Sequence, residues 1–112
     1  MLPPQSFLPL KPVAFQILMS LADGECHGYA ITQDIARRTS AAMRVEPGNL
    51  YRFLKELLDN RLIEETNRRD DDERRRYYRL TTLGRKVASA ETERLAALVT
   101  EARGKKWLRG KA

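Results

Sequence analysis

The segment PGNLYRFLKELLDN, residues 47–60, decides the fold. Proline is favoured in the first turn of a helix, so we expect a helix to begin at Pro47. Asn60 tolerates the left-handed backbone conformation that often ends a helix. Apolar residues recur at the i, i+3, i+4 and i+7 spacing of a buried helical face, formed by Leu50, Phe53, Leu54, Leu57 and Leu58. The opposite face is polar and carries Asn49, Arg52, Lys55, Glu56 and Asp59. The pattern predicts an amphipathic helix with one face in the core and the other in solvent.

Two shorter helices are expected before this segment. Apolar residues at helical spacing predict the first helix over 13–22 and the second over 28–38. The prolines that precede the first helix keep the first dozen residues out of regular helical structure. Residues 43–45, Met-Arg-Val, are expected to form a brief strand before the third helix.

A hairpin and a long helix are expected after the third helix. Residues 62–66 and 76–80 are rich in β-favouring side chains, and the charged stretch 67–75 between them suits a polar hairpin tip. Thr81 or Thr82 is expected to cap a long last helix. The chain is therefore predicted to be mainly α with a small β-hairpin, as a winged helix-turn-helix followed by a long C-terminal helix.

Size and composition restrict the class of protein. The 112 residues suffice for one domain, and 21 Lys and Arg against 15 Asp and Glu give a net charge of +6. This excess suits a polyanionic partner, although a merely solvated surface is an equal alternative. A lone Cys26 cannot form an intramolecular disulfide, and neither a signal peptide nor an apolar stretch of the ~20 residues that span a bilayer is recognisable. We therefore expect a cytoplasmic protein.

Three segments of the chain resemble those of PadR-type regulators. They are DGECHGYAI at 23–31, PGNLY at 47–51 and RRRYYRLTTLG at 74–84, and the resemblance covers about residues 12–103 in the same order. Three linked motifs at the right separations are far more specific than any single one.

Two positions depart from the pattern of these regulators. Asn49 stands where they usually have Thr or Ser, and Arg61 stands where they prefer Gly at the end of the third helix. We expect Asn60 to take over the turn from the missing glycine. The departures leave the predicted fold unchanged, but they affect the expected DNA sequence preference.

The resemblance implies binding to double-stranded DNA, with the N-terminal turn of the third helix in the major groove. A tyrosine of that helix and residues of the second helix would contact the DNA backbone, and arginines of the wing would follow the backbone or the minor groove. Residues 64–79 contain six acidic residues and six Arg, so a solvated loop with internal ion pairs is the alternative for the wing. The residues expected to contact DNA are Tyr29, Gln33, Gly48, Asn49, Tyr51, Arg52, Lys55, Arg69, Arg74 and Arg75.

The last helix predicts a homodimer. A helix of about 20 residues is ~30 Å long, which is more than a small winged-helix body covers, so its apolar residues would stay partly exposed in a monomer. A two-fold dimer would place two third helices about one DNA turn (~34 Å) apart on a pseudo-palindromic operator. The residues expected in the dimer interface are Leu83, Val87, Leu95, Leu98, Val99 and Ala102.

Related regulators with one helix after the wing respond to small aromatic or hydrophobic compounds near the dimer interface. The resemblance therefore implies a repressor that such an effector releases, with ordinary core and interface packing as the alternative for the same side chains. The expected pocket residues are Phe7, Leu8, Phe15, Met19, Leu95, Leu98 and Val99. The expected parts of the chain are a winged helix-turn-helix with its N-terminal arm at 1–82, a dimerisation helix at 83–103 and a flexible basic tail at 104–112.

Catalysis and metal binding are not expected. Cys26 and His27 are adjacent, so their side chains diverge, and the chain has no other Cys or His to complete a catalytic relay or a metal shell. His27 is instead assigned to the turn that enters the second helix, and no cofactor is predicted. The competing class is a winged helix that binds proteins and not DNA, which a shallow salt dependence of binding would reveal.

Overall fold

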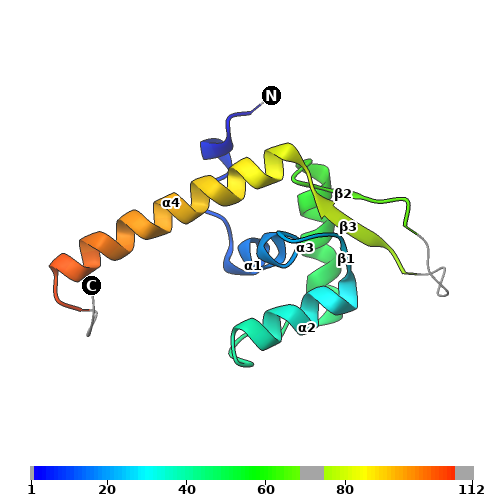
Figure 1. Cartoon of the computed structure of the whole chain (residues 1–112), viewed down its shortest axis with the longest axis horizontal. Helices are drawn as coiled ribbons and strands as arrows, with labels where there is room; N and C mark the ends of the chain where they lie inside the picture. The colour runs from blue at the N-terminus through cyan, green and yellow to red at the C-terminus, as the bar shows by residue number, and fades with distance from the viewer. Residues whose placement is uncertain (1, 69–74, 108–112) are drawn as a thin grey trace.

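The computed structural model describes residues 2–68 and 75–107, and Figure 1 shows a body of short helices from which one long helix extends. The predicted fold class is confirmed, because the chain is mainly helical with a small antiparallel sheet. In chain order the elements are η1 (Pro4–Phe7), α1 (Pro12–Ser20), β1 (Cys26–His27), α2 (Gly28–Arg38), α3 (Pro47–Asp59), β2 (Ile63–Glu65), β3 (Tyr77–Leu80) and α4 (Thr82–Gly104). None of the helices in the described ranges is both long and apolar enough to cross a membrane.

The hydrophobic core lies between α1, α2, α3 and the first half of α4. The expected apolar face of α3 is confirmed, since Leu50, Leu54 and Leu57 are buried, while Phe53 and Leu58 lie at its edge and are half-buried. The fully buried aliphatic side chains that meet this face come from every neighbouring element and are Ile17, Leu18, Leu21, Ile31, Ile35, Leu62, Ile63 and Val87.

The sheet has three strands in the order β1-β3-β2, one more than the predicted hairpin. Cys26 and His27 pair with Tyr78 and Tyr77, so the entry to α2 is joined to the wing. A two-residue strand has no sequence periodicity of its own, and it forms only because a distant strand pairs with it. The strand predicted at 43–45 is wrong, because this segment forms no ladder and its apolar side chains pack directly on the core.

The turn after α3 uses Arg61 and not Asn60. Asn60 has φ of −85° and is the C-cap, whereas Arg61 has φ of +61°. The Leu62 amide donates to the Leu57 carbonyl at 3.0 Å, and the Arg61 amide donates to Leu58 at 3.0 Å. This pair of hydrogen bonds requires the left-handed backbone conformation at the residue after the C-cap. The expectation for Asn60 was therefore wrong by one position.

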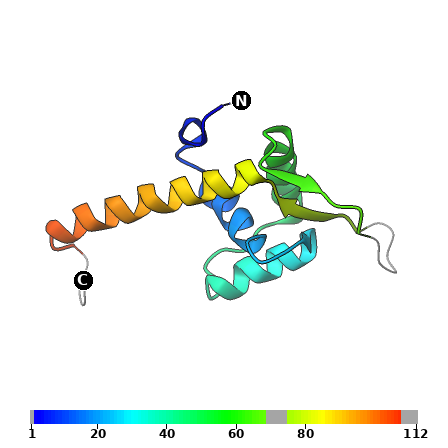
Figure 2. The ribbon, with the colours of Figure 1, turned by 45° about the horizontal axis from the view of Figure 1, so that its top comes forward.

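Thr81 fastens the start of α4 to the rest of the body. Its Oγ1 accepts a hydrogen bond from the Gly84 amide at 2.9 Å and donates to the Arg61 carbonyl at 2.7 Å. A Cβ atom at Gly84 would lie 1.9 Å from the Leu62 carbonyl oxygen, so only glycine permits this approach. Of the two threonines proposed as caps, Thr81 is the one that caps the helix. Beyond this junction α4 leaves the body on the side away from the wing (Figure 2).

Candidate nucleic-acid interface

The N-terminal half of α3 carries an exposed polar surface. Asn49, Arg52 and Lys55 are all exposed, as the sequence predicted for the face opposite the core. The Arg52 Nη2 donates a hydrogen bond to the Asn49 Oδ1 at 3.0 Å, which holds an amide and a guanidinium together as one unit. Lys55 forms an exposed ion pair with Asp59 at 3.0 Å. These groups are the types that recognise base edges and phosphates.

The first turn of α3 is open to a partner. Gly48 is exposed, and a Cβ built on it would meet nothing within 4 Å. The packing of the described chain therefore does not require a glycine at this position. The Glu46 side chain makes no cap hydrogen bond to this first turn, and free amide groups at a helix N-terminus favour anions.

A notch of about 360 Å³ separates α3 from α2 and the wing. Tyr29 and Tyr51 are 64% and 59% exposed at its rim, so both side chains lie at the surface and not in the core. The Gln33 Nε2 donates to the Tyr29 Oη at 2.7 Å. The residues that line the notch are His27, Gly28, Tyr29, Tyr51, Arg75, Arg76 and Tyr78.

Gly28 allows α3 to lie close to the start of α2. A Cβ there would approach Leu50 Cδ2 to 3.2 Å and Tyr51 Oη to 3.5 Å. Gly28, Arg76 and Tyr78 were not predicted as site residues, because strand pairing far along the chain brings them beside Tyr29. The segments 23–31, which contains Gly28, and 74–84, which contains Arg76 and Tyr78, offered the only local signals.

The base of the wing is held by ion pairs. Arg76 pairs with Glu65 at 3.1 Å and Arg79 pairs with Glu64 at 3.4 Å. Arg68 lies 4.3 Å above the Tyr77 ring. Internal ion pairs, which were the alternative expected for the wing from its sequence, are therefore present at its base. Arg75 is exposed beside the notch, whereas the predicted contacts Arg69 and Arg74 lie outside the described residues.

The contacts of His27 and Cys26 indicate structural roles for both side chains. The His27 Nδ1 accepts a hydrogen bond from the Ala30 amide at 3.2 Å, which confirms its assignment to the turn that enters α2. Burial and the nearby Asp34 charge raise the pKa of the Cys26 thiol. A raised pKa disfavours the thiolate and hence nucleophilic or redox chemistry. The described residues contain no group of His, Cys, Asp and Glu that would hold a metal ion.

A polar network not anticipated from the sequence fixes α2 against α1. The Asp34 carboxylate accepts hydrogen bonds from Ser20 at 2.8 Å and Arg38 at 2.7 Å, and it also pairs with Arg37. Arg38 in turn donates to Gln16 on α1 at 2.6 Å. Burial acts to raise the pKa of Asp34, but the hydrogen bonds from Arg38 and Ser20 outweigh it and hold the pKa below its usual value. The network positions α2, and with it the rim of the notch.

Residues 17–90 match the Transcriptional regulator PadR-like family, which is more than half of the chain. The chain belongs to this family. It is 36% identical over 92 residues to the Transcriptional regulator Rv3488 of Mycobacterium tuberculosis, a match that covers 82% of this chain and 83% of the relative. The resemblance stated from the three sequence segments is therefore confirmed.

Solved structures show the same fold. A transcriptional regulator from Clostridium thermocellum superposes with a TM-score of 0.72 at 27% identity, over 87% of this chain and 93% of that chain. Bacillus subtilis PadR, solved in complex with operator DNA, gives a TM-score of 0.63 at 23% identity, over 71% of this chain and 47% of that chain. PadR-like proteins are transcriptional regulators and not enzymes, as expected for this chain.

The dimerisation helix expected in this PadR-like regulator divides into two parts. Leu95, Leu98 and Val99 are 36%, 47% and 42% exposed and form, with half-buried Ala102, an apolar stripe on the outer half of α4. Val87, by contrast, is fully buried in the core of its own chain and cannot face a partner, so its assignment to the interface was wrong. Leu83 is half-buried and packs against the same core.

In the described part of the PadR-like chain, neither of the two pockets that Phe7 lines contains any of the other six residues predicted to bind an effector. Phe7 lines a large groove near the start of α4, whose lining includes none of the other six. Phe7 and Leu8 pack on the core, while Met19 is exposed on α1 and the three α4 residues lie on its outer half. A pocket built from all seven therefore stays a prediction that requires a second copy.

Proposed function

We propose that this regulator is a homodimer that binds a pseudo-palindromic operator, with the N-terminal half of α3 in the major groove. The observation that carries the proposal is the exposed Asn49–Arg52 unit on the outer face of α3, beside the notch. Bacillus subtilis PadR, which shares the fold, was solved with operator DNA. The width of a major groove accepts one helix, whose side chains then reach base edges.

Each group near α3 has a distinct proposed role. Asn49 and Arg52 read bases, because an amide suits adenine and a guanidinium suits guanine. Gly48 and Lys55 contact phosphates at the two ends of this surface. Tyr29, Gln33 and Tyr51 bind the DNA backbone at the rim of the notch, where their hydroxyl and amide groups are exposed.

The wing has a smaller proposed role than α3. Arg75 follows the DNA backbone or minor groove, and Arg69 and Arg74 are proposed to do the same, although both lie outside the described residues. Arg76 and Arg79 are engaged by Glu65 and Glu64, which lowers the positive charge available at the base of the wing. Because residues 64–79 carry equal numbers of acidic and Arg side chains, the wing adds little net attraction for phosphates.

Dimerisation and control are proposed to share the outer half of α4. The stripe of Leu95, Leu98 and Val99 would be covered by the same stripe of a second copy. The dimer acts as a repressor, and a small hydrophobic or aromatic compound between α1 and α4 of the two copies releases it. Such a compound shifts the dimer only if it binds one arrangement more tightly than the other.

The test of DNA binding is fluorescence anisotropy with the promoter of the chain's own gene neighbourhood and a scrambled duplex, at two salt concentrations. We expect tight, salt-sensitive and sequence-dependent binding of two chains per site. The logarithm of affinity should fall by about 0.9 per neutralised phosphate for each unit of log salt. Equal, weak binding to both duplexes at low salt would overturn the proposal in favour of a protein-binding module.

A matched pair of variants locates the contact. Arg52→Ala removes a positive charge from α3, and Lys86→Ala removes one from the solvent side of α4. Loss of a base contact costs about 1 to 3 kcal/mol, so Arg52→Ala should weaken promoter binding about tenfold or more and reduce the preference over the scrambled duplex. Lys86→Ala should change neither. Equal effects of the two would indicate a general charge effect and would remove α3 from the interface.

The effector proposal has its own measurement. A panel of aromatic compounds is added to the protein, and both the thermal midpoint and promoter affinity are recorded. A ligand of the proposed pocket should raise the midpoint and weaken promoter binding, because it stabilises the folded dimer in an arrangement that fits DNA less well. A panel that changes neither quantity would remove the effector from the proposal.

A further inference from the structure

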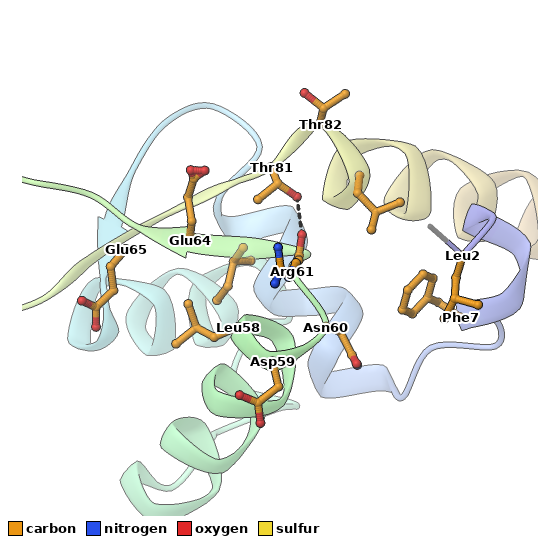
Figure 3. A pocket seen from close by; sticks show the side chains of 12 residues that line it. Leu2, Phe7, Leu58, Asp59, Asn60, Arg61, Glu64, Glu65, Thr81 and Thr82 are labelled. Atoms are coloured by element: carbon orange, nitrogen blue, oxygen red, sulfur yellow. Dashed lines mark hydrogen bonds between the residues drawn. The ribbon is translucent and has the colours of Figure 1, made fainter.

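An apolar groove lies where the end of α3, the start of β2 and the start of α4 meet, on the side of η1 (Figure 3). Its volume is about 1040 Å³, and one end of it is formed by Phe7 of η1 and by Leu2, which precedes η1. Leu58, Ile63 and Leu83 form the apolar floor near the junction. Three carboxylates, those of Asp59, Glu64 and Glu65, stand on its rim.

Trp107 is an exposed aromatic side chain at the opposite end of the molecule. It follows directly after the turn that ends α4, and it is 80% exposed. It is also the only tryptophan in the sequence. An indole contributes a large apolar area when buried, and tryptophans are enriched at the centres of interfaces.

We propose that the groove receives Trp107 of the partner subunit in the dimer, an inference that rests on the dimer proposed above. The occupant is a second copy and not the same chain. The 23 residues of α4 place about 34 Å of rigid helix between the groove and the Trp107 of its own chain.

The exposed stripe of α4 indicates how two copies of the chain would be arranged in the proposed dimer. Two α4 helices packed antiparallel by Leu95, Leu98 and Val99 bring the C-terminal end of one helix level with about residue 91 of the other, and the following Trp107 level with about residue 88. Thr82 and Leu83, which line the groove, lie about one and a half turns before that level. The Trp107 of the partner subunit then lies at the η1 side of the groove, near Leu2 and Phe7.

Charge complementarity supports the same occupant. Trp107 follows Lys105 and Lys106, whereas the rim presents Asp59, Glu64 and Glu65. The carboxylates already form exposed pairs with Lys55, Arg79 and Arg76, and such pairs are weak and readily shared with another cation. Arg61, also on the rim, offers a guanidinium on which an indole face can stack.

The docking joins dimerisation to the DNA-reading elements. Leu58 and Asp59 belong to the last turn of α3, and Ile63 begins the first strand of the wing. An indole from the partner that fills the groove would therefore pack against the last turn of α3 and the first strand of the wing.

The test measures contact between two chains by quenching of tryptophan fluorescence. Both chains carry Cys26→Ser, so that added cysteines are unique. One chain keeps Trp107, and the other carries Trp107→Phe with Asn60→Cys labelled by a nitroxide at the groove. The control places the nitroxide at Arg37→Cys on α2, far from the groove. Native mass spectrometry of each mixture measures the fraction of heterodimer.

We expect the groove label to remove most of the tryptophan emission of the heterodimer and the α2 label to leave it nearly unchanged. Glu64→Lys with Glu65→Lys in the labelled chain should restore much of the emission, because the rim would then repel Lys105 and Lys106. Heterodimers with equal emission for both labels would overturn the docking while leaving the dimer intact. Absence of any dimer at micromolar concentration would overturn both.

Discussion

The two halves of α4 belong to one continuous helix, but only the first half is buried against the body of its own chain. In the first half Gly84, Val87 and Glu91 are buried against the body of their own chain. The second half extends away from the body (Figures 1 and 2). Its Leu95, Leu98 and Val99 lie on the same helical face by their spacing and are partly exposed. The comparison teaches that an apolar stripe marks a helical face suited to burial, but does not tell whether its own chain or another chain buries it.

The two halves also differ in the kind of contact they make. The first half fits a particular surface, because Gly84 meets a backbone carbonyl and Glu91 receives specific hydrogen bonds. The stripe on the second half consists of aliphatic side chains, which suit a symmetric partner with the same stripe. The first half is thus part of the fold, and the second is the surface proposed for assembly.

The largest expected effect contrasts one glycine in each half. Gly84→Ala would force a Cβ atom against the Leu62 carbonyl, so we expect a loss of about 3 kcal/mol in the free energy of unfolding. Gly104→Ala is the control, because nothing lies within 4 Å of its added Cβ, and it should be neutral or stabilising by up to about 1 kcal/mol. Urea denaturation of both variants measures the difference. Similar losses would show that the two halves are not distinct.

The next effect concerns assembly and not folding. Leu98→Glu places two carboxylates face to face in the proposed dimer, and we expect its dissociation constant to rise about a hundredfold, or about 2.7 kcal/mol. The free energy of unfolding of the single chain should change little, because Leu98 is half exposed. Sedimentation velocity follows the dissociation, with Thr100→Glu on the other side of α4 as control. A dimer unaffected by Leu98→Glu would place the interface elsewhere.

The smallest effect lies at the boundary between the halves. Glu91 is only 2% exposed, and its carboxylate accepts hydrogen bonds from Arg94 and from the Leu10 amide at 3.2 Å. We expect Glu91→Gln to cost about 1 to 2 kcal/mol of unfolding free energy near neutral pH, because a charged hydrogen bond is lost. The exposed neighbour Glu93→Gln should cost less than about 0.5 kcal/mol.

The pH dependence of this effect has a defined sign. The Arg94 hydrogen bonds, with the Leu10 amide, hold the pKa of Glu91 below its usual value against the opposing effect of burial. The stabilisation is therefore complete above the pKa of an unfolded glutamate, about 4.3, and is lost as the pH falls through the lower folded pKa. The difference between wild type and Glu91→Gln should shrink in acid. A difference that stayed constant down to pH 3 would contradict the assignment.

Regular elements of this fold were predictable because each has its own periodicity. The face of α3, the extent of α2 and the cap at Thr81 follow from local chemistry, and the structure confirms them. The pairing of Cys26 and His27 with β3 was not predictable, since it depends on residues about fifty positions away. The buried Glu91 was missed for a related reason, because its charge is compensated by a distant backbone amide and by Arg94.

The candidate site likewise has a part that local sequence patterns predicted and a part that depends on distant segments of the chain. The exposure of Asn49, Arg52 and Lys55 followed from the helical pattern, whereas the notch beside them depends on three separate segments. Arg61 shows the limit of a local rule, because the left-handed position was assigned to Asn60 from residue type alone. The helix continued through Asp59, and this placed the turn one residue later.

The junction at Thr81 and Gly84 has a mechanical consequence for the proposed dimer. It sets the angle at which α4 leaves the body, and α4 acts as a lever arm about 34 Å long. A tilt of about 5° at its base displaces the far end by about 3 Å, close to the rise of one DNA base pair. Two contacts resist such a tilt. The Leu62 carbonyl lies against Gly84, and the Thr81 hydroxyl makes hydrogen bonds to both the Gly84 amide and the Arg61 carbonyl. In the proposed dimer, Thr81 and Gly84 would therefore set the spacing between the two α3 helices, although neither residue is among those proposed to contact DNA.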